Sequence, residues 1–120
     1  RRPVLLIAED TDSNYLLLSL MLRKEYEVIR AGDGEEVVRL CEQIQPDAVL
    51  MDIQMPVMDG LKATQQIRRS GSRVPIIAVT AYAYDRDRQK ALEAGCDEYL
   101  AKPLTGDTLR QTLHRLLAGE

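Results

Sequence analysis

The chain has 120 residues, of which 45% are hydrophobic and 29% charged, and its formal net charge is −3. A domain of this length buries a core without disulfide or metal staples. The slightly acidic balance argues against direct nucleic-acid binding, and no apolar run is long enough to insert into a membrane. Cys41 and Cys96 lie far apart, so we interpret them as buried, reduced thiols of a cytoplasmic protein.

The chain begins without Met, has no recognisable signal peptide, and its first predicted strand starts almost at once, near Pro3. We therefore expect residues 1–120 to form a single domain taken from a longer protein.

Short apolar runs alternate with helical stretches along the chain. Strands are predicted at 4–8, 27–31, 48–52, 75–80 and 98–102. Helices are predicted at 11–26, 35–45, 60–69, 84–94 and from Thr105 onward. Five alternations of strand and helix require crossover connections, which build a parallel sheet covered by helices on both faces. The predicted fold is a doubly wound α/β domain of the (βα)5 type.

Cap residues and apolar spacing predict how the helices end and which faces are buried. Asp12 or Ser13 is expected to cap the helix over 11–26, and Thr105 the last helix. Gly95 is expected to end the helix over 84–94. The apolar faces are predicted to contain Leu17, Leu20 and Met21 in the first helix, Val37, Val38, Cys41 and Ile44 in the second, and Leu109, Leu113, Leu116 and Leu117 in the last.

Polar residues follow or end four of the predicted strands: Glu9-Asp10, Asp52, Thr80 and Lys102. If the sheet is parallel, these residues share its carboxyl edge, where open α/β sheets place their sites. Three crowded carboxylates repel one another, and Mg²⁺, which prefers oxygen ligands, would relieve the repulsion. An ammonium and a hydroxyl at the same edge complete a phosphoryl-binding set. The best nucleophile is Asp52, because carboxylates can accept a phosphoryl group.

The same residues carry a family resemblance. Glu9-Asp10, Asp52 within "MDIQMPVMDG", Thr80 followed by Ala81, Tyr99, and Lys102-Pro103 occur in the order and spacing of the receiver domain of two-component response regulators. The chain resembles that family over essentially its whole length. The pattern "MDxQMPxMDG" and Asn14 resemble receivers attached to hybrid sensor histidine kinases. The resemblance implies the flavodoxin-like strand order 2-1-3-4-5.

The resemblance also implies roles at the site. Asp52 would accept a phosphoryl group from a phosphohistidine on a histidine kinase or phosphotransfer domain, and would lose it slowly by autodephosphorylation. Mg²⁺ would be held by Glu9, Asp10, Asp52 and the backbone carbonyl of Gln54. Lys102 would pair with the phosphate, and its peptide bond to Pro103 would be cis.

A conformational switch is implied as well. Thr80 would hydrogen-bond a phosphate oxygen and move toward it, and Tyr99 would turn inward into the space that Thr80 leaves. The surface made by the helix over 84–94, the strand over 98–102 and the last helix would then change. Phosphorylation could also lead to dimer formation. Tyr82, two residues after Thr80, is bulky and would shield the phosphoryl group from water.

Other interpretations are weighed against this one. Asp52 alone could be a solvated strand end, Glu9-Asp10 alone a helix cap, and Tyr99 a packing residue. A haloacid-dehalogenase-type phosphatase would need a second acid where Gln54 stands. A flavin or nucleotide module would need a Gly- or Ser/Thr-rich loop instead of "EDTDSN". A receiver used only as a phosphorylation-independent binding platform, or a response regulator separated from its output domain, stays an alternative.

Overall fold

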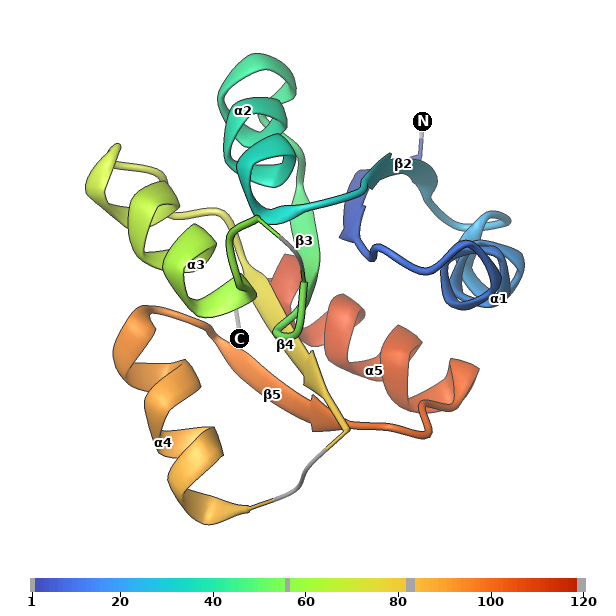
Figure 1. The fold of residues 1–120 in the computed structure, drawn as a ribbon. Coiled ribbons are helices and arrows are strands. Elements are labelled where there is room, and N and C mark those ends of the chain that lie inside the picture. The colour runs from blue at the N-terminus through green and yellow to red at the C-terminus, as the bar shows by residue number, and fades with distance from the viewer. Residues whose placement is uncertain (1, 56, 82–83, 119–120) are drawn as a thin grey trace.

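The computed structural model describes residues 2–55, 57–81 and 84–118, and over these residues strands and helices alternate as predicted (Figure 1). The strands are β1 (Val4–Ala8), β2 (Glu27–Ala31), β3 (Ala48–Asp52), β4 (Ile76–Thr80) and β5 (Glu98–Ala101). The helices are α1 (Asp12–Leu22), α2 (Gly34–Ile44), α3 (Gly60–Arg69), α4 (Asp85–Ala94) and α5 (Gly106–Leu117).

The five strands form one parallel sheet in the order β2-β1-β3-β4-β5. Every residue of β3 and β4 is buried, which explains why their sequences are continuous apolar runs rather than alternating ones. The strand order reverses beside β1, between β1 and β3, and this is where an open α/β sheet leaves room for a site. The predicted (βα)5 architecture and strand order are confirmed.

The helices cover both faces of the sheet (Figure 1). On one face α2, α3 and α4 contribute Val37, Ile67 and Ala91 to a core that also holds Met51. On the other face α1 and α5 pack Leu22 and other leucines against the sheet. Two hydrophobic cores therefore hold the sheet from both sides and fix the positions of its strand ends.

The prediction for the first helix was wrong in its ends. α1 stops at Leu22 rather than continuing to residue 26. Residues 23–25 form a turn, in which the Glu25 N–H bonds the Leu22 carbonyl at 3.1 Å, and Tyr26 is buried in the core. The N-cap is Thr11, in place of Asp12 or Ser13, and its side chain makes no capping hydrogen bond.

The buried face of α1 also differs from the prediction. Leu18 and Leu22 face the core, whereas Leu17 is 56% exposed and Leu20 is 50% exposed. The segment "YLLLSLML" is apolar on every side of a helix, so its periodicity cannot indicate which side meets the sheet. The result is an exposed row of leucines beside a buried one.

The other local predictions hold more closely. Thr105 accepts a hydrogen bond from the Thr108 N–H as the N-cap of α5, and Gly95 ends α4 with φ of 116°. Cys41 and Cys96 are buried free thiols. The predicted apolar positions of α2 and α5 are buried or half-buried, except for Ile44, which is exposed. Within the described residues, none of the helices has the length and hydropathy of a membrane span.

Candidate functional site

The three predicted acids meet at the carboxyl edge of the sheet. Asp52 is the last residue of β3 and is 7% exposed, while Glu9 follows β1 directly and is 2% exposed. Asp10 is exposed. One carboxylate oxygen of each residue lies within 4.8 Å of those of the other two. Because β1 and β3 are paired neighbours, the fold itself brings these side chains together.

Backbone amides fix two of the carboxylates. The Gln54 N–H donates to Oδ1 of Asp52 at 3.0 Å, and the Thr11 N–H donates to Oε2 of Glu9 at 3.1 Å. Burial raises the pKa of Glu9, and the nearby charge of Asp52 raises it further, against the lowering effects of the Thr11 hydrogen bond and Lys102. The ionised form of Glu9 is therefore costly in the protein alone.

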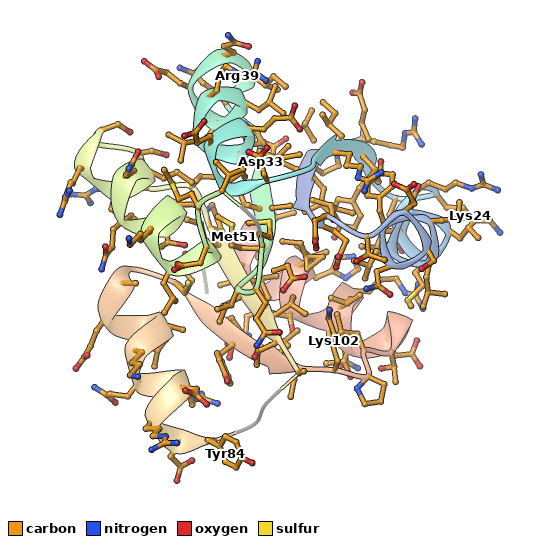
Figure 2. The ribbon with its side chains drawn as sticks, viewed as in Figure 1. Lys24, Asp33, Arg39, Met51, Tyr84 and Lys102 are labelled. Carbon is orange, nitrogen blue, oxygen red and sulfur yellow. The ribbon has the colours of Figure 1, made fainter. Side chains whose placement is uncertain are left out.

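Lys102 brings a positive charge to this cluster. It lies in the connection between β5 and α5, beside the carboxyl ends of the strands (Figure 2). Its Nζ is 3.7 Å from Oε1 of Glu9 and 3.7 Å from Oδ2 of Asp52. Its backbone N–H bonds the Thr80 carbonyl at 2.7 Å, and the Lys102–Pro103 peptide bond is cis, as predicted.

Thr80 and Tyr99 form a second pair at the site. Thr80 is the last residue of β4 and Tyr99 belongs to β5, the paired neighbour of β4; both are buried. Burial raises the pKa of Tyr99, and a side-chain hydrogen bond with Thr80 partly counters this effect. Tyr99 therefore lies inside the molecule, while its movement between two positions stays a prediction. Tyr82 lies outside the described residues.

The loop after Asp52 is held by two close approaches that sequence reasoning did not identify. A Cβ on Gly60 would lie 2.5 Å from the Asp52 carbonyl oxygen, and a Cβ on Gly34 would lie 2.0 Å from the carbonyl oxygen of Met58. Only glycine fits at either place. The backbone of Val57 is left-handed, with φ of 69°, a conformation that β-branched residues rarely adopt. In the sequence, these close approaches are signalled by Gly34 at the start of α2 and by Gly60 after Asp59.

An apolar groove of 260 Å³ opens next to the acidic cluster. Glu9 and Lys102 line it together with Asn14, Leu17, Leu18, Met21, Pro103 and Leu104. Leu17, which is mostly exposed, forms part of its wall. Sequence reasoning missed this surface in part because it assigned Leu17 to the core.

The donor set fits a hard divalent cation. Three carboxylates converge, two of them buried, and the repulsion between Glu9 and Asp52 is one of the causes of the raised Glu9 pKa. Mg²⁺ takes such oxygen ligands and keeps several bound waters. Asp10 is exposed, so one side of the cluster faces solvent. The arrangement is an acidic cluster consistent with a magnesium-binding phosphoacceptor site.

Comparisons with known proteins agree with this geometry. The family model for the response regulator receiver domain matches residues 5–114. Hybrid signal transduction histidine kinase G of Dictyostelium discoideum is 43% identical over 117 residues; the match covers 92% of this chain and 3% of that kinase. Protein PilH of Pseudomonas aeruginosa is 36% identical over 118 residues, covering 96% of this chain and 98% of PilH.

A solved structure gives the same result for the fold. The receiver domain of a sensor histidine kinase from Pseudomonas aeruginosa PAO1 is 41% identical to this chain, with a TM-score of 0.91, covering 98% of this chain and 99% of that one. That structure has a magnesium ion coordinated in its active-site cleft. The chain belongs to the response regulator receiver domain family, as its resemblance to the receivers of hybrid sensor kinases predicted.

Proposed function

We propose that the chain is a phosphorylation-dependent signalling switch in which Asp52 accepts a phosphoryl group from a phosphohistidine in a Mg²⁺-dependent reaction. The observation that carries the proposal is the convergence on Asp52 of two further carboxylates and the Lys102 ammonium at one strand edge. Receiver domains accept phosphoryl groups from histidine kinases, and a related receiver holds Mg²⁺ in its cleft.

Each residue has a role that its position supports. Glu9, Asp10, Asp52 and the backbone carbonyl of Gln54 would hold Mg²⁺. When bound, this ion neutralises charge on the phosphoryl oxygens. The Gln54 N–H keeps Oδ1 of Asp52 oriented. Lys102, 3.7 Å from Asp52, would pair with a phosphoryl oxygen as the group arrives.

The transfer itself is a direct displacement. A carboxylate oxygen of Asp52 forms a bond to phosphorus while the P–N bond to the donor imidazole breaks, and the bonding electron pair stays on the imidazole nitrogen. Slow attack by water on the aspartyl phosphate would return Asp52 to its carboxylate. No side chain is assigned to activate that water, which agrees with a switch rather than a turnover enzyme.

The Thr80–Tyr99 pair would carry the response. The Thr80 hydroxyl would donate to a phosphoryl oxygen on Asp52 and thereby change its hydrogen bond with Tyr99. Tyr99 belongs to β5 and lies in the core cluster to which α4 contributes Ala91. A change at Tyr99 would alter the surface of α4, β5 and α5, which is where an output partner or a second copy would bind.

The donor would be a histidine kinase or a phosphotransfer domain. Asp52 is nearly buried, so a phosphohistidine reaches it only when the donor lies on the surface around the cleft. On one side that surface is the apolar groove of α1, Pro103 and Leu104, which ends at Glu9 and Lys102. In the Dictyostelium relative the matched segment is a small part of a kinase, and we propose a similar setting for this chain.

The proposal is tested by intact mass spectrometry after incubation with acetyl phosphate. Wild type is expected to gain one phosphoryl group in Mg²⁺ and none in EDTA. Asp52→Asn is expected to gain none, whereas Asp59→Asn, which changes an exposed acid that caps α3, is expected to behave as wild type. Equal labelling of wild type and Asp52→Asn would reject Asp52 as the acceptor.

A further inference from the structure

The β1–α1 loop, which carries Glu9 and Asp10, is tied to the edge strand β2 by one arginine. Arg30 of β2 donates from Nε to the Glu9 carbonyl at 3.1 Å and from a terminal nitrogen to Oδ1 of Asp12 at 2.7 Å. Its guanidinium carbon lies 5.0 Å from the centre of the Tyr15 ring. One side chain therefore contacts the start of the loop, at Glu9, and the first turn of α1, at Asp12 and Tyr15.

These contacts complete a set that immobilises Glu9. The Glu9 N–H donates to the Ala31 carbonyl of β2 at 3.0 Å, and its carboxylate accepts from the Thr11 N–H. With the Arg30 bond, both backbone polar groups of Glu9 are bonded to the same edge strand. Asp10 follows directly, so the same contacts limit where its exposed carboxylate can lie.

Arg30 also pairs with Asp12, a fourth acid close to the cluster of Glu9, Asp10 and Asp52. Asp12 is two residues from Asp10 and almost fully exposed. In the described residues, the acidic cluster consists of Glu9, Asp10 and Asp52 and does not include Asp12. The Asp12 carboxylate instead pairs with Arg30 of β2 at 2.7 Å.

We infer that Arg30 is a positioning residue for the divalent-cation site: it orders the β1–α1 loop so that Glu9 and Asp10 present their carboxylates together with Asp52. The inference rests on the proposed function, because it assumes that this cluster binds Mg²⁺. Residues that orient metal ligands commonly change metal affinity about 10-fold or more when they are replaced.

The test is the Mg²⁺ dissociation constant of the full chain, measured by isothermal titration calorimetry well below the unfolding temperature. Arg30→Met keeps the apolar stem and removes the guanidinium. It is expected to weaken Mg²⁺ binding about 10-fold, and Arg30→Lys, which restores one charged donor, is expected to lie between Arg30→Met and wild type. Arg39→Met, which removes an exposed arginine of α2 that pairs with Glu36 of the same helix, is the matched control and should bind Mg²⁺ as wild type does.

The outcomes separate the inference from the function on which it rests. If wild type does not bind Mg²⁺, the metal part of the proposed function fails, and the inference fails with it. If wild type binds and folded Arg30→Met binds within about 2-fold of it, only the inference is overturned, even if Arg30→Met unfolds at a lower temperature. If Arg30→Met does not fold, Arg30→Gln replaces it under the same criterion.

Discussion

The negative charge of Glu9 is costly to the protein because the side chain is buried. It is more buried than Asp52, and burial is the main cause of its raised pKa. Lys102 compensates the two buried carboxylates with one charge shared at equal distances of 3.7 Å. Without a cation the cluster holds excess negative charge, so binding of Mg²⁺ and stability of the fold should be linked.

Glu9→Gln separates the cost of the buried charge from the stabilisation by bound Mg²⁺. In EDTA the variant is expected to unfold at the same temperature as wild type or higher, because a costly buried charge is removed. Mg²⁺ at about 100 times the dissociation constant should stabilise wild type by about 2.7 kcal/mol, and the variant by much less. Thermal unfolding with and without Mg²⁺ measures both. Glu35→Gln, at an exposed acid of α2, is the control, and an equal Mg²⁺ effect in Glu9→Gln and wild type would contradict the assignment.

Cys41 is expected to be unreactive for an electrostatic reason. Burial raises its pKa to about 11, against a partial lowering by Arg68. At pH 8 about 0.1% of this thiol is thiolate, the form that reacts. Alkylation of folded Cys96→Ser by iodoacetamide, followed by mass spectrometry, should therefore be slow and accelerate up to about pH 11. A rate at pH 8 equal to that of a free cysteine peptide would refute this account.

The raised pKa of Cys41 also determines how the stability of the fold changes with pH. The folded pKa of Cys41 lies above its ordinary value of 9.0. The contribution of this thiol to stability is therefore fully present below pH 9 and is lost as the pH rises through about 11. Ionisation of Cys41 and Cys96, whose pKa values are both raised by burial, should thus favour unfolding in strong alkali, whereas near neutral pH these thiols should not make stability depend on pH.

At the scale of elements, the position of α2 fixes the loop that follows Asp52. Gly34→Ala would place a Cβ 2.0 Å from the Met58 carbonyl oxygen, so α2 and the loop must separate. Such overpacking should lower the free energy of unfolding by about 1–3 kcal/mol. Phosphorylation of Asp52 should also slow, because Gln54 lies in the displaced loop. Urea unfolding and the acetyl phosphate reaction measure the two effects.

Gly32→Ala is the matched control for this change. Among the described residues, a Cβ on Gly32 meets the Glu36 carboxylate alone, at 3.7 Å, which is an ordinary contact. This variant should keep the loop and the reaction rate of wild type. A loss of phosphorylation as large as that of Gly34→Ala would show that the close approach to Met58 is not the cause.

Most elements could be predicted from sequence because each carries its own signal. The buried strands are continuous apolar runs, and Asp59, Gly95 and Thr105 mark helix ends through local hydrogen bonds or backbone geometry. The face of α1 could not be predicted, because leucines surround that helix. The choice of Leu18 and Leu22 for the core is made by packing against the sheet, which is not encoded in local periodicity.

At the scale of the whole molecule, the acids at the site were predictable because a parallel sheet brings its strand ends together. The contacts of Arg30 were not, since strand order alone does not say which backbone and side-chain groups of the β1–α1 loop this side chain reaches. The groove was missed for a related reason: its lining comes from α1 and from residues 103–104, far apart in the sequence. Features formed between distant segments require the tertiary structure.

The groove leads to a prediction about the donor. Leu17 lines it and is mostly exposed, so a donor docked there would bury this side chain. Leu17→Ala is expected to lower the rate of transfer from a phosphohistidine donor, relative to the rate from acetyl phosphate, about 10-fold. Leu92→Ala, at an exposed leucine of α4, is the control for loss of apolar surface. An unchanged ratio in Leu17→Ala would place the donor elsewhere.

The central claim is that Asp52 itself forms the acyl phosphate, and the most direct measurement is to locate the modified residue. Borohydride reduction converts an aspartyl phosphate to homoserine, which peptide mass spectrometry can place in the sequence. After acetyl phosphate and Mg²⁺, homoserine is expected at position 52 and at no other acid. Homoserine at Asp10 or Asp59, 5-hydroxynorvaline (the corresponding product from glutamate) at Glu9, or no reduced residue in a chain that had gained a phosphoryl group, would contradict the account.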